Sequence, residues 1–322
     1  MNTGTDSGEI RRNIKGFMKR RETTLITILI IMCFLISLLS PAFLTSMNLL
    51  NVMRQICMIV ILAMGQTLAL SSGAIDLSMG ATVGLSGVVM AYTYQITSNA
   101  FISLLIALLS GCLVGLINGV LVAKFRIVPF IATLGMLSIV KGAVVTATDA
   151  NFITFKNDFL SSIGQGYVGK IPVPVIIMTI IVIIFEIVYS KTVFGSRIKA
   201  IGGNEEAARI SGIRIDRYKI LVFIISGLTA SIAGIIMASR IGIGQPEAGL
   251  GWELDAIAAS VVGGTSMSGG EGSIIGALIG AAIIGFISNG MTLLGISSFI
   301  QPVITGLLLI SVVGIDMWKS RK

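Results

Sequence analysis

Long apolar stretches separated by short polar segments dominate this sequence. Most stretches hold about 18 to 22 residues, the length that an α-helix needs to cross a hydrocarbon core of about 30 Å. The pattern predicts membrane spans over residues 24–43, 50–70, 76–95, 101–123, 127–147, 171–190, 219–239, 253–264, 272–293 and 299–317. We therefore expect an all-α fold: a polytopic membrane helical bundle of about ten transmembrane helices, some of them broken or short.

The stretch 253–264 is too short for a full crossing. Irregular backbone at membrane depth occurs only where protein or water covers it, so this stretch is typical of a half-helix that lines a cavity. Ten crossings fit the pattern, and eight fit it if two segments are re-entrant.

The remaining polar segments are too short to fold as separate domains. We expect a cytoplasmic N-terminal segment at 1–23, a single transmembrane domain at 24–317 and a cytoplasmic tail at 318–322. A charged loop at about 191–219 interrupts the domain. The stretch from residue 24 is longer than a signal-peptide core, which indicates a retained first span.

Composition and charge support this interpretation. The chain is 54% hydrophobic, only 12% charged and carries a formal net charge of +8. Cytoplasmic loops of membrane proteins collect lysine and arginine. With both termini inside, all but five of the 23 lysines and arginines fall in cytoplasmic segments; the five are Arg54, Lys141, Lys156, Lys170 and Arg240. The charge therefore indicates orientation in a membrane and not nucleic-acid binding.

Several kinds of chemistry are excluded or disfavoured. There is no histidine, and Cys33, Cys57 and Cys112 sit in apolar stretches without the spacing of a metal site. Residues 164–171 nearly match a phosphate-binding loop, but Ile171 replaces the magnesium-binding Ser or Thr, prolines follow, and the segment faces away from cytoplasmic ATP. We expect no catalytic residues, no metal and no nucleotide site in this chain.

Glycines recur at four-residue spacing within the predicted spans. Such rows let helix backbones approach closely in lipid. The rows are Gly80 and Gly84; Gly111, Gly115 and Gly119; and Gly272, Gly276 and Gly280. They predict a compact bundle.

Polar positions inside the spans are the candidates for a substrate pathway. Two polar breaks, 71–80 and 263–272, each precede a Gly-Ala-x-x-Gly pattern, and paired interruptions can mark an internal repeat. Asp76 either caps a helix beginning at Leu77 or faces a cavity, and the two roles are compatible. Hydrogen bonding to a neighbouring helix is the commoner role of such residues. The pathway candidates are Gln66, Asp76, Ser78, Asn118, Thr133, Asp255 and Asn289.

The charged loop contains a short helix pattern. Asn204 suits the N-cap, Glu205 and Glu206 suit the positive end of the helix dipole, and Gly212 suits the C-terminal stop. A helix of about two turns is not stable alone in water. The rest of the chain or a partner must therefore hold it.

Four groups of motifs, in order, resemble the permease subunits of ribose-type ABC importers. They are Gly65–Thr67 with Gly73–Gly80; Gly202–Ile213; Glu253–Ala259 with Val262–Ser266 and Gly269–Gly270; and Gly285–Phe286 with Asn289–Gly290 and Leu293–Gly295. The resemblance runs from about residue 40 to the end of the chain. Ala74 and Met79 stand where Gly and Val are common in the family, and Glu271 stands where Lys is common.

The resemblance implies a multi-pass permease of the cell inner membrane that pairs with an identical or homologous permease. It implies a cytoplasmic ABC ATPase, which uses ATP and Mg²⁺, and an extracytoplasmic sugar-binding protein that meets external loops including 241–252. The family carries pentoses, hexoses and related polyols, including the furanosyl autoinducer-2 signal. The short helix becomes the element coupled to the ATPase, formed by Gly203, Asn204, Glu205, Glu206, Ala207, Ala208, Arg209, Ile210, Ser211 and Gly212.

Three other classes provide alternatives. An ion-coupled secondary transporter of a small polar solute would need buried titrating carboxylates, for which Asp76 and Asp255 are the candidates. An intramembrane enzyme would need a nucleophile or metal motif that this sequence lacks. A passive channel would conduct without ATP.

Overall fold

The structure is a computed structural model. It describes residues 6–297 and also 300, 301, 303, 304, 306, 307, 310 and 314, with side chains described from Glu22 onward. The expected last span, 299–317, and the tail, 318–322, therefore lie largely or wholly outside the described residues.

Within the described residues the chain forms twelve helices and four two-residue strands. The helices are α1 (Asp6–Leu39), α2 (Ser46–Ser71), α3 (Met79–Thr97), α4 (Ala100–Ala123), α5 (Pro129–Thr148), α6 (Asp158–Gln165), α7 (Val173–Lys191), α8 (Val193–Gly203), α9 (Glu205–Ile210), α10 (Ile215–Ile241), α11 (Trp252–Val262) and α12 (Ile274–Leu293). The strands are β1 (Ile153–Thr154), β2 (Tyr167–Val168), β3 (Ile171–Pro172) and β4 (Ile243–Gly244), which pair antiparallel as β1 with β4 and β2 with β3.

Seven of the described helices are long and apolar enough to cross a membrane. They are α2, α4, α5, α7, α10, α12 and the part of α1 from Glu22 to Leu39. The expected span 76–95 corresponds to α3, which has 19 residues but is diluted by Gly, Ser, Thr and Tyr and is not among the seven. The predicted all-α membrane fold is thus confirmed as a mostly helical bundle.

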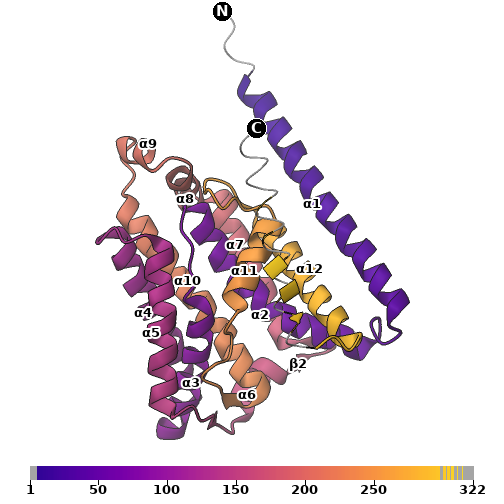
Figure 1. Cartoon of the computed structure of the whole chain (residues 1–322). Coiled ribbons are helices and arrows are strands. Elements are labelled where there is room, and N and C mark those ends of the chain that lie inside the picture. Colours follow the sequence, from indigo (N-terminus) through magenta and orange to yellow (C-terminus); the bar gives the residue numbers. More distant parts are fainter. Residues whose placement is uncertain are drawn as a thin grey trace, which may run out of the picture.

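The helices α2 and α10 form the centre of the bundle. The main core joins buried residues of α2, α3, α7, α8, α10, α11 and α12. Helix α1 stands apart at one side of the bundle in Figure 1 and packs against α12. The rest of the described chain covers little of its membrane-length part.

Rows of small residues bring α4 and α10 into close contact, as the sequence predicted. A Cβ placed on Gly115 would lie 2.1 Å from the carbonyl oxygen of Phe223, and one on Gly111 would lie 1.9 Å from the Ser231 hydroxyl. In α12, a Cβ on Gly280 would lie 2.1 Å from the carbonyl oxygen of Ala259 in α11. These glycines permit backbone contact that any larger residue would block.

The predicted half-helix is α11, whose 11 residues span only about 16 Å. The segment before it descends into the bundle along α3. A Cβ on Gly244 would meet the Gly87 carbonyl oxygen, one on Gly84 would meet the Pro246 carbonyl oxygen, and one on Gly80 would meet the Gly249 carbonyl oxygen. The contacts move down α3 as the chain advances, so residues 244–251 run back along α3 inside the bundle; we call them the re-entrant segment.

Two polar loops carry helices that the sequence pattern did not predict. Helix α6 and strand β2 lie between the expected spans 127–147 and 171–190, β3 lies at the start of the second of these, and α8 precedes the predicted short helix. The stretch that resembles a phosphate-binding loop ends α6 and forms the β2–β3 hairpin, with Gly169 at φ +63° in its turn. A phosphate-binding loop follows a strand and opens a helix with its last residues. Here α6 precedes the stretch, and its last residue, Ile171, lies in β3.

The α4–α10 contact yields a stability prediction. Gly115→Ala should destabilise the protein by about 1–3 kcal/mol, because the new methyl group overlaps the α10 backbone. A lower midpoint of thermal unfolding in detergent would show it. Gly142→Ala in α5 is the matched control, because a Cβ there meets no atom within 4 Å. Equal midpoints for the two variants would contradict the packing argument.

Candidate functional site

The short helix α9 forms where the sequence placed it. The Asn204 side chain accepts a hydrogen bond from the Ala207 N–H at 2.9 Å, and the helix ends at Ile210 before Gly212 at φ +79°. In Figure 1, α9 lies at the tip of the bundle, at the end where α1 begins. It is therefore a projecting element outside the seven membrane-length helices.

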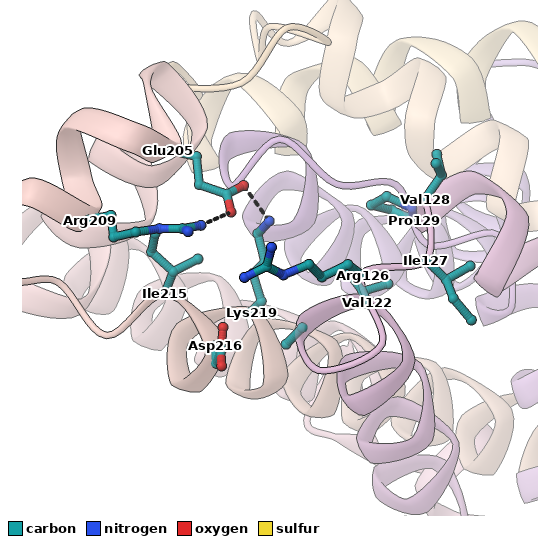
Figure 2. A pocket seen from close by; sticks show the side chains of 11 residues that line it. Val122, Arg126, Ile127, Val128, Pro129, Glu205, Arg209, Ile215, Asp216 and Lys219 are labelled. Carbon is teal, nitrogen blue, oxygen red and sulfur yellow. Dashed lines mark hydrogen bonds and ion pairs between the residues drawn. The ribbon is translucent and has the colours of Figure 1, made fainter.

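Contacts with α8 and α10 hold this six-residue helix in place. Ala208 is buried in a small cluster with Ile201 and Ile215. Glu205 accepts from Lys219 at 2.6 Å and from Arg209 at 3.3 Å, as Figure 2 shows. Because Ile215 and Lys219 belong to α10, α9 is fastened to a helix that runs through the bundle.

A charged pocket lies between α9 and the loop that joins α4 to α5. Its cavity volume is about 310 Å³. In Figure 2, Arg126 approaches Lys219 from the α4–α5 side, opposite Glu205 and Arg209. The lining residues are Val122, Ala123, Arg126, Ile127, Val128, Pro129, Glu205, Arg209, Ile215, Asp216 and Lys219. Charges of both signs line it, which suits contact with a polar protein surface.

Helix α8 contacts the C-terminal ends of α2 and α7. A Cβ on Gly202 would lie 2.0 Å from the Ser71 carbonyl oxygen. The Lys199 ammonium lies 4.1 Å from the centroid of the Tyr189 ring. Burial lowers the pKa of Lys199, and the nearby Glu186 carboxylate opposes that change. The platform beneath α9 is thus part of the bundle and not a loose loop.

A second group of polar residues lies inside the bundle around Asp76. One carboxylate oxygen of Asp76 accepts from the Ser78 N–H at 2.9 Å and the Ser78 hydroxyl at 2.6 Å, and the other accepts from the Ser226 hydroxyl at 2.6 Å. The Ser78 hydroxyl in turn accepts from the Asn118 amide at 2.8 Å. This network joins the α2–α3 break to α4 and α10.

The helix after this break begins at Met79 and not at Leu77. Asp76 therefore stabilises the turn before α3 by bonding the N–H two residues ahead. Thr133 of α5 lies against the same turn, where its hydroxyl contacts the Ile75 carbonyl oxygen at 3.2 Å. Four of the pathway candidates, Asp76, Ser78, Asn118 and Thr133, thus lie together although they come from distant parts of the sequence.

Comparison with known proteins places the chain in a family. Residues 48–313 match the family described as "Branched-chain amino acid transport system / permease component". The chain is 40% identical over 324 residues to the ribose import permease protein RbsC of Escherichia coli K12, which covers 99% of this chain and all of that protein. It is 42% identical over 294 residues to RbsC of Bacillus subtilis 168, covering 91% of each chain. It is 36% identical to the L-arabinose transport system permease protein AraH of E. coli K12, covering 87% of this chain and 86% of that protein.

The chain belongs to this ABC importer permease family. It is a multi-pass protein of the inner membrane and is not itself the catalytic component. No solved structure matches the chain. The resemblance that the four groups of motifs indicated is confirmed.

The other three pathway candidates of this permease take no part in the hydrogen bonds of the Asp76 group. Both polar side-chain atoms of Gln66, in α2, are buried without a hydrogen-bond partner among the described residues. Asp255 is half-buried in the first turn of α11. Asn289 exchanges two hydrogen bonds with Asn48, at 3.0 and 2.9 Å, and so joins α12 to the start of α2.

Sequence reasoning missed Ser226, which completes the Asp76 network, and Ser260, which accepts from Thr67 at 3.1 Å. Serine is common in apolar helices because its hydroxyl can bond its own backbone. No local signal therefore distinguishes a serine that bonds another helix from one that does not.

The Asp76 network in this permease yields a second prediction. Ser226→Ala should destabilise the protein by about 1.5–3 kcal/mol, because the buried carboxylate loses one of its three donors. Thermal unfolding in detergent measures the change. Ser239→Ala, on the same helix, should cost much less because the buried Ser239 hydroxyl has no partner within the described residues. In an Asp76→Asn background the Ser226→Ala effect should shrink; an undiminished effect would mean that the serine acts elsewhere.

Proposed function

We propose that this chain is the transmembrane permease subunit of an ATP-driven, binding-protein-dependent importer for ribose or a similar monosaccharide. The identity to ribose import permeases over almost the whole chain supports ribose, and the identity to an arabinose permease supports the wider monosaccharide class. The observation that carries the coupling role is α9, a capped helix outside the membrane-length helices that is fastened to α10.

We place both termini in the cytoplasm. The start of α1 and helix α9 lie at one end of the bundle in Figure 1. Lys124, Arg126, Lys191 and Arg197 belong to the loops and helix at that end, so the cations gather where the positive-inside pattern puts the cytoplasm. The placement of the C-terminal tail at 318–322 rests on the sequence alone.

A cytoplasmic ABC ATPase is the partner expected at α9. Ile210 is 81% exposed on a helix that water would surround in the free chain, and the charged pocket lies beside it. An apolar side chain flanked by charges of both signs suits docking to a protein surface. ATP and Mg²⁺ belong to that partner.

The contacts of α9 provide a route for transmitting ATPase movement. A displacement of α9 would be transmitted to α10 through the Glu205–Lys219 ion pair and through the buried contact of Ala208 with Ile215. Helix α10 packs against α2, α3 and α4 and carries Ser226 of the Asp76 network. Alternating access would follow if rigid helices tilt together around that network.

Two further partners complete the importer. A second permease, identical or homologous, would pair with this chain across the membrane. A sugar-binding protein would dock on the external face, which includes the β2–β3 hairpin and the end of α10 near Ile241. The expectation that the whole segment 241–252 is an external loop is wrong, because residues 244–251 pack along α3 inside the bundle. Substrate selection would rest mainly with that binding protein.

The coupling role predicts that Ile210→Asp weakens ATPase association. The loss should be at least about 2 kcal/mol, or about 30-fold in Kd, as at a central interface position. Pull-down of the ATPase and ATP-driven ribose uptake in proteoliposomes measure it. Val193→Asp changes a similarly exposed apolar residue on α8 and serves as the control.

Ile210 is a sharper probe than Glu205 or Glu206. Reversing Glu205 would also break its ion pairs with Lys219 and Arg209 and so disturb α9 itself. Full ATPase association and uptake with Ile210→Asp would exclude the proposed docking surface.

Because ATP hydrolysis is assigned to a partner subunit, we predict that the purified permease alone has no transport or ATPase activity. Reconstituted without partners, it should neither hydrolyse ATP nor concentrate ribose inside vesicles. Addition of the ATPase and the binding protein should produce both activities. Ribose accumulation by the chain alone, sensitive to an uncoupler, would instead support an ion-coupled transporter.

A further inference from the structure

One ion pair lies far from the charged residues around α9. The Lys141 ammonium is 3.2 Å from a carboxylate oxygen of Glu247. Lys141 lies 12 residues after the first residue of α5, about 18 Å along the helix axis, and Glu247 belongs to the re-entrant segment. The other ion pairs of the described residues lie at the α9 end of the bundle.

This pair does not face lipid. Its side chains are 42% and 59% exposed in the single chain. A charged side chain in the hydrocarbon core costs at least about 2.5–3.5 kcal/mol, and such groups face a protein interior or a water-filled cavity. The surface around the pair must therefore be wet or covered by protein.

The adjoining face of α5 is open. A Cβ placed on Gly135 or Gly142 would meet no atom within 4 Å, in contrast to the glycines of α4. Ser138 lies between them, is exposed, and bonds only its own helix, at the Leu134 carbonyl oxygen. The exposed side of α5 also carries Ile131, Leu134 and Ile139, so the small and polar part is a stripe formed by Gly135, Ser138 and Gly142 next to Lys141.

The re-entrant segment forms the neighbouring part of this surface. Leu250 packs against an apolar cluster that includes Val140 and Val144 of α5, which holds the segment near that helix. Asp255 follows in the first turn of α11 and is half-buried. The ion pair thus stands where two elements meet, with the Ser138 hydroxyl on α5 and the carboxylates of Glu247 and Asp255 on the other side.

We infer that the open face of α5 and the Lys141–Glu247 pair form one wall of the water-filled substrate passage. This inference rests on the proposed import of a neutral sugar. A paired ammonium and carboxylate offer a sugar both a hydrogen-bond donor and acceptors without net charge. The second permease completes the passage from the opposite side.

Thiol labelling tests the wall directly. In a background with Cys33, Cys57 and Cys112 replaced by alanine, Ser138→Cys should react with a charged, membrane-impermeant methanethiosulfonate reagent. Leu113→Cys on α4 is the matched control. Leu113 lies ten residues before the last residue of α4, and Ser138 lies nine residues after the first residue of α5. Because one short loop joins these two helix ends, the two positions have similar depth. Labelling at 138 should be at least about tenfold faster, because the thiolate that reacts forms in water and not in hydrocarbon.

Equal and slow labelling at both positions would overturn the inference. So would protection of Ser138→Cys together with disulfide cross-linking between two copies, because the face would then be a packed dimer contact. The labelling needs no ATPase and no sugar. A failure of the proposed import function is therefore distinguishable from a failure of this inference.

Transport by the reconstituted importer provides the second arm, with ribose as the probe. Labelling of Ser138→Cys should block uptake, and the same treatment of Leu113→Cys should not. Lys141→Glu should reduce uptake at least about tenfold, since two carboxylates then repel each other, and the exchange Lys141→Glu with Glu247→Lys should restore it. Full uptake after complete labelling at 138 would remove this face from the passage.

Discussion

The absence of water in the hydrocarbon core governs this structure. Every polar group that enters the core must be satisfied by the protein or stand in a cavity that water fills. Asp76 shows how the first condition is met: the α2–α3 break exposes backbone at depth, and three donors from Ser78 and Ser226 surround the carboxylate. The Lys141–Glu247 pair, partly exposed in the single chain, is the group that we propose meets the second condition.

Close helix packing makes such a network possible. In lipid, hydrophobic burial does not drive helices together, so small residues and interhelical hydrogen bonds do. Glycines of α4 lie against the α10 backbone, and this contact holds Asn118 and Ser226 near the same turn. The glycine rows and the polar cluster are therefore two parts of one arrangement.

The same packing connects α9, where the ATPase would dock, with the polar network around Asp76. Helix α9 is too short to be stable alone, and its contacts with α8 and α10 supply what it lacks. Helix α10 then passes the length of the bundle and carries Ser226. A movement imposed at α9 by an ATPase would thus act on the centre of the membrane domain through rigid, packed elements.

The sequence by itself determined the membrane class, the approximate helices, the capped α9 and the family. Each follows from local patterns: apolar length, cap residues and ordered motifs. It did not predict α6, α8 or the depth of residues 244–251, because polar loops lack a strong periodic signal. Only the tertiary structure decided that Asp76, Ser78, Asn118 and Thr133 meet, while Gln66, Asp255 and Asn289 take no part in that network. Which helices adjoin depends on packing between segments far apart in the chain, and the local sequence of one helix does not identify the helix that packs against it.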